Sequence, residues 1–260
     1  MDKCDFLIIG GGIIGISIAR ELKKRHPRAT LMLIEKEKDY GLHASGRNSG
    51  VLHAGFYYTA DSFKAKFTQA GNQRLTEYCE SRNIPVNKCG KLVAAQNKSE
   101  LSQLDELMVR AKNNNVPLNS ITEEEAKAIE PRVKTFERAL FSPTTSSVNP
   151  SQVVKAMCDD AKQEGLKLRS GVRYLKRTGK AIVKTTQGNI EFGYMVNSAG
   201  LYADKIAQDF GFSRDYRILP FKGLYLYSNE SVGSFKTNIY PVPDLRNPFL
   251  GVHFTVTAEG

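Results

Sequence analysis

A glycine-rich turn near the N-terminus is the first group of residues whose spacing indicates chemistry. Gly10, Gly12 and Gly15 form a G-x-G-x-x-G pattern between an apolar stretch and a segment with helical periodicity. In this pattern the first glycine permits a tight turn, the second lets the backbone approach a pyrophosphate, and the third lets the helix close on the strand. The phosphates then meet a helix N-terminus, which favours negative charge. The spacing therefore predicts a dinucleotide site.

An acidic residue follows at the distance expected for the ribose. Glu35 lies at the end of the next apolar stretch and can accept hydrogen bonds from a ribose diol. The same carboxylate would repel a 2′-phosphate, so NADP is disfavoured. The turn and the glutamate together do not separate FAD from NAD.

Two later segments favour a flavin. The loop 44–50 (Ala-Ser-Gly-Arg-Asn-Ser-Gly) offers backbone N–H and hydroxyl donors and one positive charge, Arg47, although such a loop is also compatible with an ordinary surface turn. The segment 194–204 is expected to be a strand that ends at Ala199-Gly200 and opens a helix. It provides a second place where the backbone can come close to a ligand.

These segments resemble those of the FAD-dependent D-amino-acid-oxidase-like oxidoreductase superfamily. Within it, residues 44–58, 238–244 and 249–255 are most similar to the L-2-hydroxyglutarate oxidase/dehydrogenase branch. The resemblance covers essentially the whole chain. It implies an FAD, held covalently or not, that takes a hydride at N5 from the α-carbon of a small 2-hydroxy acid, while a base removes the hydroxyl proton.

The resemblance also implies which residues hold the cofactor. Gly10, Gly12, Gly15 and Glu35 would bind the ADP half, with Lys36 beside the adenosine and Val172 flanking the adenine. The pyrophosphate and flavin side would be lined by Ser45, Arg47, Asn48, Ser49, Gly50, Ala199 and Gly200.

Two histidines are candidates for the base, because an imidazole titrates near neutral pH and can accept a proton. His53 follows the 44–50 loop and should lie near the flavin ring, and His253 belongs to the expected substrate domain. A lone histidine is also compatible with a structural role. The candidate substrate residues are Tyr57, Tyr58, Lys222 and Tyr240, and Arg246 reads better as a solvated charge.

The elements that must position these residues alternate between strands and helices. We expect strands at 5–9 and 30–35 around a helix at 13–25, which is a βαβ unit. Further helices are expected at 61–82, 99–112, 150–165 and 201–209, another helix starts at a capping box at 122–125, and strands are expected at 92–95, 166–169, 172–177, 180–186 and 190–197. The pattern from 217 to 257 is strand-like throughout.

Composition excludes several classes of protein. The 260 residues carry a net charge of +10, are 25% charged and 41% hydrophobic, and contain no apolar stretch long enough to span a membrane. Because the basic residues are spread along the chain, we expect no nucleic-acid partner, although tRNA binding stays open, as does loose contact with an anionic membrane surface. The four cysteines form no CxxC pair, so we expect a cytoplasmic protein without a metal site.

The fold class that we predict is α/β, α+β overall. A Rossmann-like FAD-binding domain would span 1–86 and 146–215, and a substrate domain with a mainly antiparallel sheet would span 87–145 and 216–260. Against the resemblance, the sequence stops inside the substrate-domain sheet, so we expect a truncated chain whose activity a longer reading frame would restore. The electron acceptor would be oxygen or a quinone. Alternatives are oxidation of an amino acid, an amine or glycerol 3-phosphate, or a flavin- or partner-binding module without turnover.

Overall fold

The computed structural model describes residues 1–244 and 251–260. The chain divides into two compact units, which we call the first unit (1–48 and 150–227) and the second unit (49–149 and 228–260). Their boundaries differ from those of the predicted domains: residues 49–86 and 146–149 belong to the second unit, and residues 216–227 belong to the first. The assignment of an FAD-binding and a substrate domain stays a prediction. Arg246, Phe249 and Leu250 lie outside the described residues.

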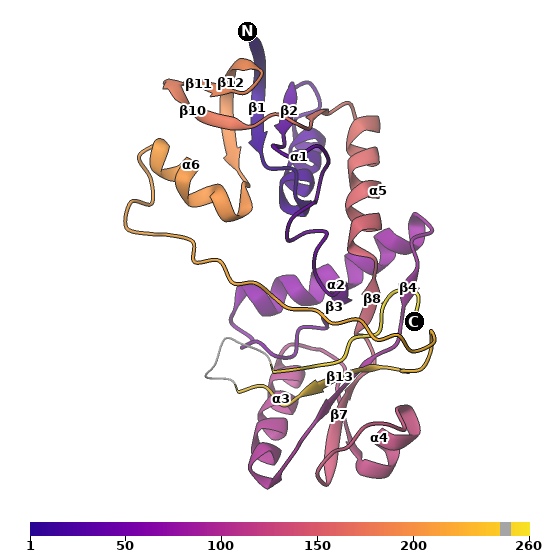
Figure 1. Cartoon of the computed structure of the whole chain (residues 1–260). Coiled ribbons are helices and arrows are strands. Elements are labelled where there is room, and N and C mark those ends of the chain that lie inside the picture. The colour runs from indigo at the N-terminus through magenta and orange to yellow at the C-terminus, as the bar shows by residue number, and fades with distance from the viewer. Residues whose placement is uncertain (245–250) are drawn as a thin grey trace. The chain divides into compact units, whose positions relative to one another are not determined.

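The first unit is built on a six-stranded sheet with the order β10-β11-β12-β1-β2-β9 (Figure 1). β1 pairs in parallel with both β12 and β2, and β2 pairs in parallel with β9. These strands are β1 (Asp2–Ile9), β2 (Leu31–Ile34), β9 (Lys167–Arg169), β10 (Tyr174–Gly179), β11 (Ile182–Thr185) and β12 (Gly188–Asn197). The parallel centre and the antiparallel β10-β11-β12 edge confirm the predicted mixed α/β class.

The predicted βαβ unit is β1, α1 (Ile13–Arg25) and β2. All four residues of β2 are buried, as expected for a strand covered on both faces. Because successive side chains of a strand point to opposite faces, Leu33 of β2 packs with α1 while Ile34 packs on the other side of the sheet. α1 ends before Pro27, which cannot continue a helix.

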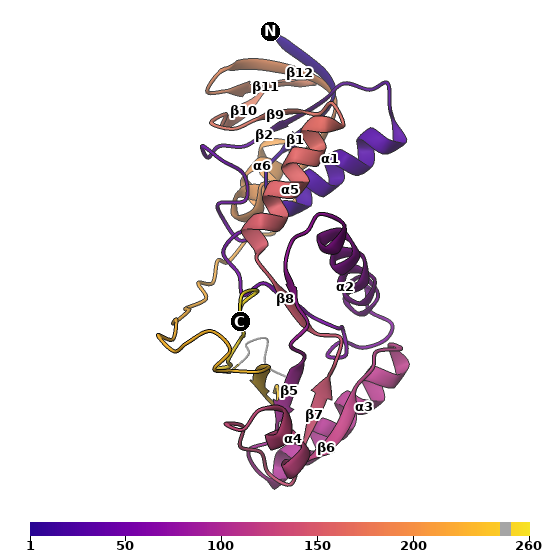
Figure 2. The same cartoon turned by 90° about the vertical axis from the view of Figure 1, so that its right-hand side faces the viewer.

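Two helices lie side by side on one face of this sheet. α5 (Pro150–Gln163) begins with proline at its first position, where the missing N–H costs nothing. Its Val154 and Cys158 pack with Ile16 of α1, and both views show the two helices adjacent (Figures 1 and 2). η2 (Gly200–Tyr202) and α6 (Ala203–Asp209) follow β12. The helices 13–25, 150–165 and 201–209 are thus confirmed within one or two residues.

The second unit contains a four-stranded sheet with the order β13-β5-β7-β6, in which only the β13–β5 pair is parallel. α3 covers one face through Leu104 and Leu107, which pack with Val93. α4 covers the other through Ala126, which packs with Leu92 (Figure 2). The mainly antiparallel sheet is as predicted.

A short three-stranded sheet, β3-β8-β4, and the helix α2 complete the second unit. The strands are β3 (Val51–Leu52), β4 (Val86–Asn87), β5 (Lys91–Ala94), β6 (Asn119–Thr122), β7 (Arg138–Ser142), β8 (Ser146–Val148) and β13 (Asn238–Pro241). The helices are α2 (Phe63–Ser81), η1 (Lys98–Glu100), α3 (Leu101–Asn113) and α4 (Glu123–Ile129). α4 starts at the predicted capping box, in which the side chains of Thr122 and Glu125 each accept the other residue's backbone N–H.

The strand prediction for 217–257 is wrong for most of its length. Within its described part the structure has only β13 and an isolated bridge between Ile239 and Phe254. The apolar residues of 216–227 are exposed, Leu226 almost completely. Alternating apolar residues make a strand only where a second backbone pairs with them, and none of the strands in the described part of the chain pairs with residues 216–227.

We predict that Gly15→Ala destabilises the fold. A Cβ at Gly15 would lie 2.0 Å from the carbonyl oxygen of Gly10, so backbone has to move. The free energy of unfolding of the flavin-free protein should fall by roughly 1–3 kcal/mol in urea titrations. Gly71→Ala in α2 is the matched control: its Cβ meets nothing within 4 Å, so it should stabilise the helix by roughly 0.5–1 kcal/mol. Equal stability of Gly15→Ala and the wild type would contradict the close approach.

Candidate active site

The glycine turn joins β1 to α1 through contacts that only glycine allows. Gly10 has a φ of +111°, and a Cβ there would lie 2.3 Å from the carbonyl oxygen of Ser198 at the end of β12. The Ser198 hydroxyl donates to the Ile9 carbonyl oxygen at 2.9 Å, which holds the end of β12 against the end of β1. The sequence prediction missed Gly11, whose Cβ would lie 2.6 Å from Cδ1 of Tyr40.

Glu35 organises the same turn from the end of β2. Its Oε2 accepts the N–H of Gly11 at 2.7 Å, and its Oε1 accepts the N–H of Glu37 at 2.9 Å. A carboxylate oxygen has two lone pairs, so each can still accept a ribose hydroxyl. In the protein without ligand, Glu35 is therefore already a structural acceptor as well as the predicted ribose partner.

Residues 39–48 close over the N-terminus of α1. The Ser45 hydroxyl accepts the N–H of Ile13 at 3.0 Å, which caps a helix whose Gly12 N-cap has no side chain. The Asn48 amide donates to the carbonyls of Ala44 and Ser45 at 2.9 and 3.0 Å and fixes the loop. The predicted loop residues Ser45 and Asn48 thus shape the loop with their own side chains.

Three further predicted cofactor residues lie around this turn. The backbone N–H of Val172 donates to the Glu35 carbonyl at 2.8 Å, although the Val172 side chain belongs to the hydrophobic core. Lys36 pairs with Glu37 and lies 4.9 Å from the centroid of the Tyr202 ring. Gly200 has a φ of +54° and open space around its Cα, which fits close approach of a ligand.

The first unit fits a bound dinucleotide. The first turn of α1 carries no acidic side chain, while Lys23, Lys24 and Arg25 occupy its last turn. The helix N-terminus therefore keeps its positive dipole end for a phosphate. The glycine turn, the Glu35 carboxylate and the open Gly200 backbone supply the other contacts that an ADP group requires.

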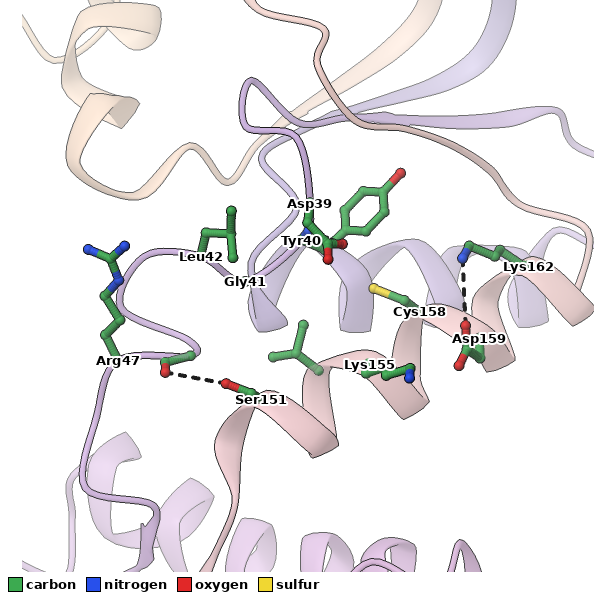
Figure 3. A pocket seen from close by; sticks show the side chains of 12 residues that line it. Asp39, Tyr40, Gly41, Leu42, Arg47, Ser151, Lys155, Cys158, Asp159 and Lys162 are labelled. Atoms are coloured by element: carbon green, nitrogen blue, oxygen red, sulfur yellow. Dashed lines mark hydrogen bonds and ion pairs between the residues drawn. The ribbon is translucent and has the colours of Figure 1, made fainter.

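A cavity of about 630 Å³ lies between the 39–47 loop and α5 (Figure 3). It contains Arg47 of the predicted site but none of the turn glycines. Lys162 is paired with Asp159 across 3.6 Å, and the Ser151 hydroxyl donates to the Gly46 carbonyl. Burial raises the pKa of the Cys158 thiol to about 12, so it is not a nucleophile at neutral pH. Nothing in this lining marks a second reactive centre.

The second unit brings together both predicted histidines and two of the predicted tyrosines. The rings of Tyr240 and His253 have centroids 4.2 Å apart, and those of His53 and Tyr240 are 6.2 Å apart. The Nδ1 of His253 lies 2.9 Å from the carbonyl oxygen of Gly251. A carbonyl only accepts, so Nδ1 is the donor in this contact, and in the neutral ring Nε2 then carries the lone pair.

Sequence reasoning missed Lys91, which lies in the middle of this group. The residue is fully buried at the start of β5, and its Nζ lies 4.3 Å from the ring centroid of Tyr57 and 4.8 Å from that of Tyr240. We call the following six residues the lysine cluster: His53, Phe56, Tyr57, Lys91, Tyr240 and His253. Lys91 follows Gly90 in an otherwise apolar strand. A lysine in a strand whose sequence predicts burial was the signal that could have identified it as a candidate site residue.

Three polar atoms of the lysine cluster are buried and have no hydrogen-bond partner among the described residues: His53 Nδ1, Tyr57 Oη and Lys91 Nζ. Buried polar groups are paired in the great majority of cases. Three such atoms in one cluster therefore mark a candidate ligand-binding place.

Burial sets the protonation states in this cluster. It lowers the pKa of Lys91 to about 7. It also lowers the pKa of His53 to about 3, with further contributions from the positive charges of Lys91 and His253, so His53 is neutral at pH 7. Burial raises the pKa of the Tyr57 hydroxyl, which stays protonated.

Four further predicted residues of the described part of the chain are not members of the lysine cluster. Tyr58 packs under Lys64, whose Nζ is 5.6 Å from its ring centroid. Lys222 is exposed in the first unit, and Arg246 lies outside the described residues. Ser49 and Gly50 belong to the second unit, where the Gly50 carbonyl accepts the N–H of Val148. Between 1 and 244 and between 251 and 260, no group of three His, Cys, Asp or Glu side chains is arranged for a metal, and no helix is long and apolar enough to cross a bilayer.

These features define a dinucleotide-dependent oxidoreductase of two units, and comparison with known proteins gives the family. The sequence pattern of the family described as "FAD dependent oxidoreductase" matches residues 5–260. The chain therefore belongs to this family, and FAD is its cofactor.

Curated relatives share a name. The chain is 39% identical over 98% of its length to mitochondrial L-2-hydroxyglutarate dehydrogenase of Nematostella vectensis and 38% identical over 98% to that of Homo sapiens. It is 36% identical over 98% to L-2-hydroxyglutarate dehydrogenase of Indibacter alkaliphilus. The chain spans 60%, 59% and 65% of these three proteins.

Two solved structures have a similar fold. L-α-glycerophosphate oxidase of Mycoplasma pneumoniae with FAD bound matches with a TM-score of 0.82 at 22% identity, over 100% of this chain and 70% of that one. Glycine oxidase of Geobacillus kaustophilus matches with a TM-score of 0.78 at 21% identity, over 93% of this chain and 66% of that one. At this identity they establish the fold.

We predict that Glu35→Gln weakens FAD retention. Glutamine keeps one acceptor oxygen, so one of the two backbone N–H groups would face an amide N–H₂, a loss of about 1–3 kcal/mol. The ratio of flavin to protein absorbance after gel filtration should fall about tenfold or more. Asp215→Asn, which removes an exposed charge from the same unit, should leave it unchanged. Full flavin content in Glu35→Gln would contradict this role.

We also predict a pH dependence of stability that belongs to Lys91. Its pKa is about 7 in the folded protein and about 10.5 when unfolded, so the unfolded chain binds more protons between these values. The free energy of unfolding therefore rises with pH, by about 1 kcal/mol from pH 7 to 8. The titratable groups facing Lys91 are His53, Tyr57 and Tyr240.

Urea titrations at both pH values measure this contribution. Lys91→Met should lose it, and the exposed Lys66→Met in α2 should keep it. The pKa values of all four cysteines are raised, and their contribution cancels in these differences. The same pH slope in both variants would show that Lys91 is not the group responsible.

Proposed function

We propose that the chain belongs to an enzyme that oxidises a small 2-hydroxy acid, L-2-hydroxyglutarate, to 2-oxoglutarate. The observation that carries the proposal is the agreement in name among relatives that are 36–39% identical over 97–100% of this chain. The lysine cluster supports it, because it combines a proton acceptor with donors suited to an anionic substrate.

The first unit would hold the cofactor. Gly10, Gly12 and Gly15 with the N-terminus of α1 would bind the pyrophosphate, and Glu35 would bind the ribose. Arg47 and the Ala199-Gly200 backbone would approach the phosphates and the flavin side. When bound, FAD supplies an acceptor at N5 for the hydride of the substrate α-carbon.

The second unit would handle the hydroxyl proton. His253 is the better placed base, because its Nδ1–H is held by the Gly251 carbonyl and its Nε2 keeps a lone pair. His53 is neutral at pH 7, and burial opposes its protonation, so it would orient the substrate rather than take the proton. As the α-carbon loses a hydride, the proton of its hydroxyl moves to His253 Nε2, and the C–O single bond becomes a carbonyl.

The predicted partners and location belong to the same proposal. The proposed electron acceptor is oxygen or a quinone. The proposed compartment is the cytoplasm, either free or in contact with a membrane surface.

We predict that L-2-hydroxyglutarate bleaches the flavin absorbance of the FAD-loaded protein in anaerobic stopped-flow measurements. His253→Asn should slow this reduction by about 10²–10⁴-fold, the range for loss of a general base, without loss of bound FAD. His53→Asn should slow it less, and His26→Asn, at the exposed C-cap of α1, should have no effect.

Two results would contradict the proposal. Absence of bleaching by L-2-hydroxyglutarate in a flavin-loaded protein, with bleaching by glycerol 3-phosphate or glycine, would reassign the substrate. Full rates in both His53→Asn and His253→Asn would remove histidine from the mechanism.

A further inference from the structure

The buried Lys91 is not explained by the fold. It lies in β5, where Leu92, Val93 and Ala94 are apolar and buried, and it is itself 0% exposed. An ammonium in such surroundings is costly unless it is paired. No carboxylate and no hydrogen-bond acceptor contacts its Nζ in the described part of the chain.

Aromatic rings supply only part of what the ammonium needs. The Nζ lies 4.7 Å from the ring centroid of Phe56, and closer still to that of Tyr57. Ring faces attract a cation, but they accept no strong hydrogen bond and carry no net charge. The charge of Lys91 therefore still lacks a counter-charge.

The neighbouring orphan atom narrows the chemistry of the missing partner. The Tyr57 hydroxyl is buried, protonated and without an acceptor, and its ring is the one closest to Lys91 Nζ. Lysine and a protonated tyrosine are both donors when they meet an oxygen anion. A group that accepts hydrogen bonds and carries negative charge satisfies both, whereas a cation or an apolar group satisfies neither.

Three residues of the lysine cluster are partly exposed. His53, Tyr57 and His253 are only partly buried as whole residues, although Nδ1 of His53 and Oη of Tyr57 are inaccessible. Lys91 and His253 both contact the ring of Tyr240, whose centroid is 4.8 Å from the lysine Nζ and 4.2 Å from the histidine centroid. An anion bound to Lys91 would therefore lie in the same cluster as the proposed base.

We propose that Lys91 and Tyr57 bind a carboxylate group of the substrate, by donating hydrogen bonds to its oxygens. The identity of that substrate rests on the function proposed above. This assigns to the second unit the cationic role that sequence reasoning gave to Lys222. Because the anion neutralises Lys91, it also removes a positive charge that opposes protonation of His53.

Glutarate is the probe, because it has the two carboxylates of 2-hydroxyglutarate but no hydroxyl to oxidise. Its binding to the FAD-loaded protein is measured by isothermal titration calorimetry. Lys91→Met should weaken glutarate binding at least tenfold, Tyr57→Phe about three- to tenfold, and the exposed Lys66→Met not at all. Lys91→Arg should retain part of the affinity.

A second readout separates this role from a merely structural one. Glutarate should stabilise the ammonium form, so its binding at pH 8 should take up close to one proton, measured in buffers of different ionisation enthalpy. Lys91→Met should abolish this uptake, and His53→Asn should preserve it. Lys91→Met should also remain folded, because it replaces an unpaired buried donor by an apolar chain of similar length.

Failure of this proposal is distinct from failure of the proposed function. Equal glutarate affinity in the wild type and Lys91→Met overturns the carboxylate role, even if L-2-hydroxyglutarate reduces the flavin. Loss of flavin reduction in Lys91→Met with unchanged glutarate binding also overturns it, since Lys91 would then act as the base. Conversely, Lys91-dependent glutarate binding without oxidation of L-2-hydroxyglutarate upholds the site and removes the substrate assignment.

Discussion

The contact between the backbone of the glycine turn and its neighbours is the constraint on which the first unit depends. At Gly15 the first turn of α1 lies against the Gly10 carbonyl, and at Gly10 the chain lies against the end of β12. Any side chain at either position would push the helix off the sheet. The same closeness exposes the helix N-terminus and brings Glu35 within 2.7 Å of the Gly11 N–H. The candidate cofactor site is thus a consequence of how tightly these backbone segments pack.

The two units treat their polar groups in opposite ways. In the first unit the predicted cofactor residues are already engaged: Glu35 accepts two backbone N–H groups, Ser45 caps α1, and Asn48 closes the loop. Such a candidate site would need little reorganisation to bind. In the lysine cluster of the second unit, three polar atoms are buried without partners. Burial without pairing costs folding free energy, and such a cost is commonly found where a protein binds a ligand.

Features that depend on local sequence could be predicted from the sequence alone. The glycine spacing, the βαβ unit, the capping box at Thr122 and the helix that starts at Pro150 depend on residues close together in the chain, and the structure contains all of them. The strand prediction for residues 217–237 is wrong, because an apolar pattern indicates only which side chains a strand would bury. It does not indicate whether a partner strand is present. Gly11 was overlooked, since the Tyr40 side chain that crowds it comes from outside the motif.

By itself, the sequence determined the class of fold and a dinucleotide site, because turns, caps and the dinucleotide pattern are local, with spacings set by the geometry of one strand and one helix. Its resemblance to a flavoenzyme superfamily then indicated FAD and the two candidate histidines. Only the tertiary structure decided that Lys91 matters. Its position next to Tyr240 comes from the parallel pairing of β13 with β5, two strands separated by well over a hundred residues. The role of a lysine depends on the groups around its ammonium. For Lys91 those groups include residues far away in the sequence.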